Sequence, residues 1–343
     1  MLALLGATGY TGGLALASAR AAGLPILLVG RRAAALDALA REGEDVRVAD
    51  ARDAASLRAA LDGVRVVVST AGPFLELGDA VVRAAIDAGA HYVDSSAEQA
   101  FARLVYDVHD EAARERGVAL LPSFGFDFVA GDLAARIAAE GIEPVEEIAV
   151  AYSVKRFRPS AGARRTLGRV LQQEQVAFEN GVHVVSSFGA TTRRFRFPDG
   201  EHTVVEWGGA EPLTVPRHTH VRNVRSYLRA PKAAARAGAL GRLFAPLVRA
   251  TGAVGRGPGA GGRARSRWAV VAEAVGTSRR RRVTLEGTDI YGLTARLLVT
   301  AAESLIAGEV AETGALAPAQ AFEARALAAR LEPLLRLTGE EES

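Results

Sequence analysis

Short apolar runs alternate with helix-like stretches through the first third of this 343-residue chain. The runs have the length of strands and lie at residues 2–5, 26–29, 46–48, 64–69, 91–93 and 118–121. Patterns typical of helices fill the intervals, at residues 12–22, 33–41, 53–61, 77–88 and 97–116. Strands that are apolar throughout and alternate with helices indicate a parallel sheet covered on both faces. We therefore expect an α/β fold in which residues 1–125 form a doubly wound parallel sheet of the Rossmann type.

The pattern changes after residue 125. Extended segments, β-branched or alternating between apolar and polar positions, lie at residues 147–154, 191–197, 203–207, 268–275 and 281–286. Helices are expected among them at residues 131–139 and 162–180. This mixture predicts a second, α+β domain over residues 126–288, with a mixed or antiparallel sheet. Helical periodicity returns at residues 291–307 and 318–331, so residues 289–343 are expected to form C-terminal helices.

Three glycines with a spacing of three follow the first apolar run directly. Gly6 permits a tight turn, Gly9 lets the backbone approach a pyrophosphate, and Gly12 lets the following helix pack closely on the strand. The N-terminus of that helix offers free N–H groups to phosphate oxygens. Because the glycines stand between a strand and a helix at the start of an alternating series, the sequence predicts a dinucleotide-binding site.

The end of the second predicted strand bears on the choice between NAD and NADP. A site for NAD usually carries Asp or Glu here, which accepts hydrogen bonds from the ribose hydroxyls. This chain has Arg31 and Arg32 instead. A guanidinium group matches a phosphate with two parallel hydrogen bonds, so NADP is the expected cofactor and NAD the less favoured one. The alternative is that both arginines only solvate the start of the next helix.

The loop after the fourth predicted strand would also line the cofactor, because ligands of such sheets lie beyond the carboxyl ends of the strands. Its small residues leave space for the ribose and nicotinamide, and Phe74 is expected to pack on the nicotinamide side. The loop residues are Thr70, Ala71, Gly72 and Pro73. The alternative is that these residues form a tight strand-to-helix turn, and one loop can have both roles.

Three carboxylates lie at the same predicted edge. Asp94 is expected to hold loops together, and Glu98 to support the first turn of the helix that follows it. Asp127 stands between Phe126 and Phe128, and an apolar setting of this kind would raise its pKa and suit a proton donor. The alternative is that Asp127 caps the predicted helix at residues 131–139.

The amino-acid composition excludes several kinds of site. The chain has no cysteine, which excludes disulfides, thiolate metal sites and a cysteine nucleophile. His218 and His220 are expected to share one face of a strand, but no third ligand is apparent and no metal site is expected. No uninterrupted apolar run has the ~20 residues of a membrane-spanning helix, and the chain starts with a strand instead of a basic leader. A cytoplasmic location is therefore expected.

The net charge of +3 is unevenly distributed. Residues 212–272 contain no Asp or Glu, while Arg recurs throughout. Within them, residues 228–266 are basic and end in a glycine-rich run, which predicts a mobile segment. Residues 240–248 have the spacing of an amphipathic helix, so peripheral contact with an anionic membrane is one hypothesis. A solvated arginine-rich segment or an ordinary packed helix is the alternative, and nucleic acid is not an expected partner.

Several motifs together resemble the saccharopine dehydrogenase-like NAD(P)-binding oxidoreductase family, and its trans-acting enoyl reductase branch in particular. They are the glycine loop from Gly6 to Gly13, Val29-Gly-Arg-Arg32, Ala71-Gly-Pro-Phe74, Gly89-Ala-His-Tyr-Val-Asp94 and Gly125-Phe-Asp127. Residues 287–294 and 315–318 are also similar to the end of such proteins. The middle of the chain matches poorly, and residues 95–97 and 125–130 depart from the common pattern on the substrate side.

The resemblance implies C-terminal helices that return to the cofactor domain, and a middle domain that holds the substrate and forms a homodimer through its sheet. It also assigns cofactor contacts by position. The glycines at 6, 9 and 12 would cradle the pyrophosphate, Arg31 would face the adenosine phosphate, and residues 71–73 would border the nicotinamide. The phosphate loop would be completed by Thr8, Tyr10 and Thr11.

The expected function is that of an NADP-dependent oxidoreductase. A hydride would pass to a small or lipid-like substrate with a polarised C=C, C=O or C=N bond. Asp127 and Tyr291 are the candidate proton donors, and Lys155 or an arginine could orient an acidic substrate. One alternative is a saccharopine-type C–N dehydrogenase that acts on an amino acid adduct. Another is a non-catalytic protein that binds NADP as a signal or structural group.

Overall fold

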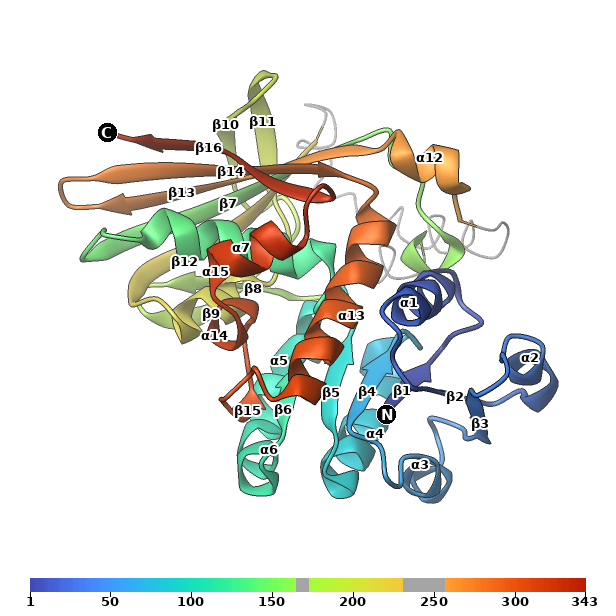
Figure 1. Ribbon diagram of the computed structural model, residues 1–343. Coiled ribbons are helices and arrows are strands. Elements are labelled where there is room, and N and C mark those ends of the chain that lie inside the picture. Colours follow the sequence, from blue (N-terminus) through green and yellow to red (C-terminus); the bar gives the residue numbers. More distant parts are fainter. Residues whose placement is uncertain (165–172, 231–256) are drawn as a thin grey trace. The chain divides into compact units, whose positions relative to one another are not determined.

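The computed structural model describes residues 1–164, 173–230 and 257–343 (Figure 1). Two compact units contain these residues. Unit 1 comprises Met1–Phe126 and Tyr291–Leu316, and unit 2 comprises Asp127–Ile290 and Ala317–Ser343. The chain first passes from unit 1 to unit 2 after residue 126. The first domain was predicted to end at residue 125.

A seven-stranded sheet forms the centre of unit 1, with the order β15-β6-β5-β4-β1-β2-β3 (Figure 1). All of its neighbouring strands are parallel. The strand order reverses its direction between β1 and β4, which defines a doubly wound sheet with its ligand crevice at that point. The predicted fold class is confirmed. The strands are β1 (Leu2–Leu5), β2 (Ile26–Gly30), β3 (Asp45–Val48), β4 (Val66–Ser69), β5 (His91–Asp94), β6 (Ala119–Leu121) and β15 (Gly314–Ala315).

The helices of unit 1 follow the predicted alternation with one division. A single helix was expected over residues 97–116, but the structure has two, which meet at His109. The imidazole of His109 lies 2.7 Å from a carboxylate oxygen of Asp79 on the neighbouring helix. The helices are α1 (Tyr10–Ala21), α2 (Ala33–Asp37), α3 (Ala54–Ala60), α4 (Phe74–Ala88), α5 (Gln99–Val108), α6 (Asp110–Arg116) and α13 (Ile290–Ala307).

Helix α13 corrects one expectation from the sequence. By length and composition it could cross a membrane, although no segment was expected to qualify. However, 72% of this 18-residue helix is buried inside the protein. A helix that is apolar around its whole circumference is also typical of a protein core, so its composition follows from its burial.

Unit 2 contains a nine-stranded sheet with the path β10-β11-β12-β7-β13-β14-β16, and β8 joins β12 to β9 beside this path. Strands β12 and β7 are parallel, while the other described pairs are antiparallel. The predicted mixed sheet is confirmed. The strands are β7 (Val145–Lys155), β8 (Gln175–Glu179), β9 (Val182–Ser186), β10 (Thr192–Phe197), β11 (Gly200–Glu206), β12 (Val221–Arg229), β13 (Arg267–Gly276), β14 (Arg280–Thr288) and β16 (Leu335–Glu342).

The helical part of unit 2 differs from the prediction in two places. The helix expected over residues 162–180 is wrong at its end, because Gln175–Glu179 is strand β8. The helix expected over residues 318–331 is divided at Phe322 and Glu323. The amphipathic stretch 240–248 and most of the basic segment 228–266 lie outside the described residues. The described helices are α7 (Phe126–Ala139), α9 (Glu211–Thr214), the 3₁₀ turn Val215–Arg217, α12 (Ala260–Ala264), α14 (Pro318–Ala321) and α15 (Ala324–Arg330).

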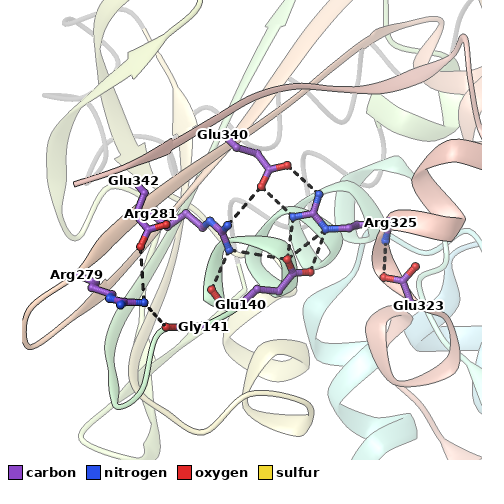
Figure 2. Close-up of polar contacts among 8 residues, drawn as sticks. All are labelled: Glu140, Gly141, Arg279, Arg281, Glu323, Arg325, Glu340 and Glu342. Carbon is purple, nitrogen blue, oxygen red and sulfur yellow. Dashed lines mark hydrogen bonds and ion pairs between the residues drawn. The ribbon is translucent and has the colours of Figure 1, made fainter.

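The C-terminal segment divides between the units, whereas residues 289–343 were expected to return as a whole to the first domain. Its last part joins unit 2 because β16 pairs with β14. Figure 2 shows the ionic network that anchors it: the Arg325 guanidinium lies 2.8 Å from carboxylate oxygens of both Glu140 and Glu340. Arg281 on β14 also donates to the backbone carbonyl of Glu140 over 2.8 Å. These contacts tie the end of α7, α15 and the final strand together.

Candidate functional site

The glycine loop of unit 1 has the backbone of an anion-binding turn. Gly6 follows β1 with φ of +88°, a conformation that residues with a side chain rarely adopt. The N–H of Gly9 donates a hydrogen bond to the carbonyl oxygen of Gly6 over 2.8 Å. Helix α1 then begins at Tyr10, with Gly9 extended at the cap position and no side chain capping the helix. The first turn also contains no acidic residue. The helix N-terminus therefore presents N–H groups and partial positive charge without a built-in anion.

Gly12 and Thr70 pack against the turn that follows β1, at the point where the strand order reverses. The Thr70 hydroxyl donates to the carbonyl of Leu5 over 3.0 Å, which joins the ends of the two strands. A Cβ placed on Gly6 would lie 2.7 Å from Thr70 Oγ1, and one placed on Gly12 would lie 2.6 Å from the same atom. Only hydrogen fits at both positions. The three backbone segments thus meet at the point where the strand order reverses, which is where doubly wound sheets bind their ligands.

Arg31 and Arg32 lie at the carboxyl end of β2, on the neighbouring strand. Both are exposed, and neither guanidinium forms a hydrogen bond or ion pair with the part of the chain that the structure describes. No carboxylate occupies the end of β2, where an NAD site would need one. Two unpaired guanidinium groups at this position fit the extra phosphate of NADP.

The loop after β4 leads into α4. Thr70, Ala71 and Pro73 are half-buried and Gly72 is exposed, so the loop is accessible at the ligand edge of the sheet. The expectation for Phe74 is wrong. Its ring is buried and packs against Phe101 of α5, with ring centroids 5.7 Å apart, because Phe74 begins helix α4 and faces the core.

Glu98 has a structural role, but at a different helix from the one predicted. Its two carboxylate oxygens accept hydrogen bonds from the backbone N–H groups of Phe74 over 3.0 Å and of Leu75 over 3.2 Å. These are the first residues of α4, and a carboxylate at a helix N-terminus is stabilising. Glu98 is fully buried. It therefore holds the start of α4, directly after the loop of residues 71–73, and it forms no side-chain cap on the following helix α5.

Asp94 holds two loops, as the sequence indicated. One oxygen accepts from the N–H of Ser96 over 2.7 Å and from the N–H of Ser123 over 3.0 Å. Ser123 follows β6 and has φ of +59°, so the carboxylate supports a strained turn at the ligand edge. Burial raises the pKa of Asp94 to about 7, against the lowering effect of these two hydrogen bonds.

Asp127 lies in the first turn of α7 and is half-buried. Helix α7 already begins at Phe126, so Asp127 is not the cap of a helix that starts at residue 131. Burial raises its pKa to about 6, as its apolar neighbours predicted. The residue before it, Phe126, belongs to unit 1 and donates its N–H to the hydroxyl oxygen of Thr294 in the same unit. By chain connectivity, Asp127 follows the carboxyl end of β6 by six residues.

The second candidate proton donor, Tyr291, belongs to unit 1. Its buried ring packs edge-to-face against Tyr10, with centroids 4.8 Å apart and an interplanar angle of 85°. Tyr10 is the first residue of α1. The C-terminal helix α13 therefore contacts the phosphate loop through this aromatic pair, although the two residues are distant in the sequence.

Sequence reasoning missed a buried polar network in unit 2. Glu211 at the start of α9 accepts hydrogen bonds from Tyr152 on β7 and Ser226 on β12, and all three side chains are buried. Gly131 and Gly209 make room for it, since a Cβ on either would overlap the Glu211 carboxylate. Burial raises the pKa of Glu211 to about 7. No local sequence motif predicts this network, because the partners of Glu211 lie on elements that are distant in the sequence.

A second buried pair corrects the expectation for the histidines. His218 follows the 3₁₀ turn and is not on a strand, so it does not share a strand face with His220. Its Nε2 lies 2.9 Å from the Asp132 carboxylate, whose other oxygen accepts from the N–H of Ala319 over 2.8 Å. Among the described residues, no group of three or more His, Cys, Asp or Glu side chains could hold a metal ion.

The order of the strands, the uncapped helix and the glycine packing define a dinucleotide-binding domain of the doubly wound class. Residues 2–120 match the model of the saccharopine dehydrogenase NADP binding domain. This part of the chain is therefore an NADP-binding domain similar to that of saccharopine dehydrogenase, as the motifs indicated. The matched region lies within unit 1.

Curated relatives match part of the chain. A lipid droplet localized protein of Caenorhabditis elegans is 32% identical over 142 residues, which are 37% of this chain and 33% of that protein. A putative trans-acting enoyl reductase of Mycobacterium tuberculosis is 35% identical over 140 residues, 38% and 33% of the two chains. A saccharopine dehydrogenase-like oxidoreductase of Bos taurus is 35% identical over 86 residues, 25% and 20%. The chain thus spans a third or less of these relatives.

A solved structure extends the likeness of the fold to both units. The apo form of histidine-tagged saccharopine dehydrogenase (L-Glu forming) from Saccharomyces cerevisiae has a TM-score of 0.66. The comparison covers 100% of this chain and 99% of that one, at 14% sequence identity. At this identity the likeness shows the fold alone.

Proposed function

We propose that the protein is an NADP-dependent oxidoreductase that reduces a lipid-like or small unsaturated substrate, in the manner of an enoyl reductase. The observation that carries this proposal is the pair of unpaired guanidinium groups, Arg31 and Arg32, beside an uncapped helix N-terminus. The names of the curated relatives support the class of reaction, since trans-acting enoyl reductases are among them.

The residues of unit 1 would bind and orient the cofactor. Helix α1 and the glycine loop would hold the pyrophosphate through backbone N–H groups, with Thr8 and Thr11 beside them. Arg31 and Arg32 would bind the 2′-phosphate. The loop of residues 70–73 would border the nicotinamide, held in place by Glu98 at the start of α4. The bound cofactor supplies the hydride.

Asp127 would supply the proton that completes the reduction. Its raised pKa keeps part of the population protonated near neutral pH, and its half-buried position limits competition from water. In an enone, hydride would add to the β-carbon and the proton from Asp127 to the α-carbon, leaving a carboxylate that solvent reprotonates. Tyr291 is the competing candidate for this step.

A saccharopine-type C–N dehydrogenase is the second candidate, because other curated relatives are named saccharopine dehydrogenase-like oxidoreductases. It would reduce the C=N bond formed by an amine and a carbonyl compound. The choice between the two rests on the substrate, and the middle of the chain, from residue 121, lies outside the matched family domain.

The discriminating experiment follows NADPH oxidation by the full-length protein. A medium-chain enoyl thioester is compared with an amino acid plus an aldehyde, and NADP⁺ affinity is measured in parallel. Oxidation with the thioester supports the proposal, and oxidation with only the amine–aldehyde pair supports the second candidate. Tight NADP⁺ binding without turnover on either substrate would contradict both and favour a non-catalytic NADP-binding protein.

We propose in addition that the protein forms a homodimer in the cytoplasm and contacts lipid surfaces peripherally. The name of one relative, a lipid droplet localized protein, supports the lipid contact. Residues 228–266 would make it through their arginines. Sedimentation equilibrium tests the dimer. Flotation with anionic vesicles tests the lipid contact, and equal flotation after deletion of residues 231–256 would contradict the role of this segment.

A further inference from the structure

A cavity of about 470 Å³ lies on unit 2, far in sequence from the cofactor loop. Its walls come from the β10–β11 hairpin on one side and from β13 and β14 on the other. Five arginines and two glutamates line it: Arg193, Arg194, Arg196, Arg280, Arg282, Glu201 and Glu273. Nothing in the proposed reaction uses this cavity.

Strand geometry explains why β14 contributes basic groups here. Residues 279–282 are four consecutive arginines, and side chains alternate between the two faces of a strand. Arg279 and Arg281 take part in the network of Figure 2, with Glu342, Glu140 and Glu340 as their partners. Arg280 and Arg282 line the cavity instead. The two pairs therefore serve different parts of the molecule.

The floor of the cavity is an ionic triad. The carboxylate of Glu273, which is buried, lies 2.9 Å from the Arg282 guanidinium and 3.3 Å from that of Arg193. Glu147 and Glu341 are the outer partners of these arginines, and their side chains are 41% and 64% exposed. Exposed ion pairs of this kind contribute little and can exchange for another anion.

Two of the guanidinium groups that line the cavity have no partner among the described residues. Glu201 pairs with Arg194, so the nearby carboxylates are already engaged. Among the described residues, Arg196 and Arg280 have no hydrogen-bond or ion-pair partner for their side chains. Both are exposed. They extend from different strands on the two walls, so that one extended anion could bind both.

The hairpin wall is fixed before any ligand binds. The Arg193 guanidinium packs over the rings of Phe195 and Tyr227, 5.0 and 5.8 Å from their centroids. Both rings are buried in one apolar cluster with β7 and β13. At the hairpin turn, Asp199 accepts from Lys155 over 2.7 Å and from Arg229 over 2.9 Å. Lys155, which the sequence suggested could orient an acidic substrate, is therefore paired with Asp199 at the hairpin turn. A preorganised wall lowers the cost of binding.

We propose that this cavity binds an anion with two or more linked phosphate groups, through Arg196 and Arg280 on its rim and Arg193 and Arg282 on its floor. Arginine forks match phosphate oxygens with paired hydrogen bonds. Two separated guanidinium groups favour a polyphosphate over a single phosphate. A volume of about 470 Å³ is within the range of small-molecule sites. The phosphates could belong to a soluble molecule or to a lipid headgroup.

Calorimetric titration of the full-length protein with tripolyphosphate tests the proposal. Saturating NADP⁺ is present, so that the glycine loop and Arg31 do not compete for the probe. The double variant Arg196→Ala/Arg280→Ala should weaken binding about tenfold or more, as expected for the loss of charge-assisted hydrogen bonds. The matched control is Arg222→Ala/Arg279→Ala, which removes the same charge from two exposed arginines outside the cavity.

The proposal is overturned if the wild type does not bind tripolyphosphate, or if both double variants lose the same affinity, since the effect would then be one of net charge. Co-sedimentation with vesicles of phosphatidylcholine and phosphatidylinositol bisphosphate separates the two sources. Loss of both tripolyphosphate and vesicle binding in the rim variant assigns the site to a headgroup, and loss of tripolyphosphate alone assigns it to a soluble ligand. Loss of vesicle binding with unchanged tripolyphosphate affinity contradicts the site.

Discussion

Gly12 lies directly against the carbonyl oxygen of Gly6, so that the first helix and the end of the first strand meet backbone to backbone. A Cβ on Gly12 would overlap this oxygen and the carbon that bears it. The neighbouring Gly13 has no such constraint, since its Cβ would lie 3.7 Å from the nearest atom, the Ala7 carbonyl oxygen. The two adjacent glycines therefore have different roles, and they offer a matched pair of substitutions.

Gly12→Ala should displace α1 from β1 and disturb the phosphate loop, because the backbone atoms that it meets cannot move aside as a side chain could. We expect at least about tenfold weaker NADP⁺ binding and a destabilisation of about 1–3 kcal/mol, typical of an overpacked site. Gly13→Ala should retain both properties. Fluorescence titration and thermal unfolding provide the measurements, and equal behaviour of the two variants would contradict the assigned packing.

Arg31→Ala/Arg32→Ala should convert the cofactor preference. Loss of charge-assisted hydrogen bonds to the 2′-phosphate should weaken NADP⁺ binding by about 10- to 100-fold, and NAD⁺ binding should stay the same. Arg58→Ala removes an exposed arginine from α3 and serves as the control. Titration of each variant with both cofactors is the measurement. An equal loss of NAD⁺ and NADP⁺ affinity would show that the arginines only support the fold.

The strands and helices of unit 1 could be read from the sequence because its signals are local. Strands β1 and β2 and most of β4 are apolar runs, and Gly23, Gly63, Gly89 and Gly117 end or follow helices at positive φ. Strand β9 and strand β16 were missed for the opposite reason. Val182–Ser186 is a short β-branched segment with no buried residue. In Leu335–Glu342 the alternation of Leu335 and Leu337 with polar residues soon gives way to three exposed glutamates, so neither segment has the long apolar run of a central strand.

Roles that depend on tertiary contacts could not be predicted. Glu98 supports α4 from 24 residues away, and Glu211 meets Tyr152 from 59 residues away. A sequence pattern reports the neighbours of a residue along one element, and these carboxylates act between elements. The raised pKa of Asp127 could be predicted from the sequence because its two chain neighbours are apolar, and burial is what raises the pKa.

Glu98→Gln should loosen the loop beside the nicotinamide position. A glutamine can accept at only one of the two N–H groups that start α4, and its amide would face the other donor. We expect a loss of stability of about 2 kcal/mol, the scale of a hydrogen bond to a charged group. Glu115→Gln, at an exposed position on α6, is the control. Equal unfolding temperatures for the two variants would contradict the capping role.

Asp127→Asn should reduce turnover by about 100-fold or more, the scale of general acid catalysis, with NADP⁺ affinity unchanged. The wild-type rate should fall as the pH rises through about 6, since the donor must be protonated and burial sets its pKa there. The variant should lack this dependence. The pH profile of kcat/KM is the measurement, and a profile unchanged by the substitution would exclude Asp127 as the donor.

Tyr291→Phe tests whether Tyr291 instead of Asp127 is the proton donor. The phenylalanine ring keeps the edge contact with Tyr10, so the cofactor loop should be undisturbed. If Asp127 is the donor, Tyr291→Phe should retain turnover within about threefold. A large loss of turnover in Tyr291→Phe together with an active Asp127→Asn would assign the proton to the tyrosine.

Glu211→Gln tests the buried network through the pH dependence of stability. Burial raises the pKa of Glu211 from 4.5 to about 7 in the folded protein. The native state therefore holds a proton that the unfolded chain releases above pH 4.5, and stability should fall as the pH rises from 4.5 to 7 and stay level above. For this group the change is about 3 kcal/mol at most. Asp132, Tyr152 and Ser226 face the same carboxyl group.

The glutamine cannot ionise, but its amide can still bond Tyr152 and Ser226. The variant should therefore gain stability relative to the wild type as the pH rises from 5 to 7.5. Taking this difference removes the contribution of Asp94, whose pKa is also raised and which is present in both proteins. Glu115→Gln, exposed on α6, should show no such trend. Calorimetric unfolding across this range is the measurement, and parallel curves for Glu211→Gln and the wild type would mean that Glu211 stays ionised throughout.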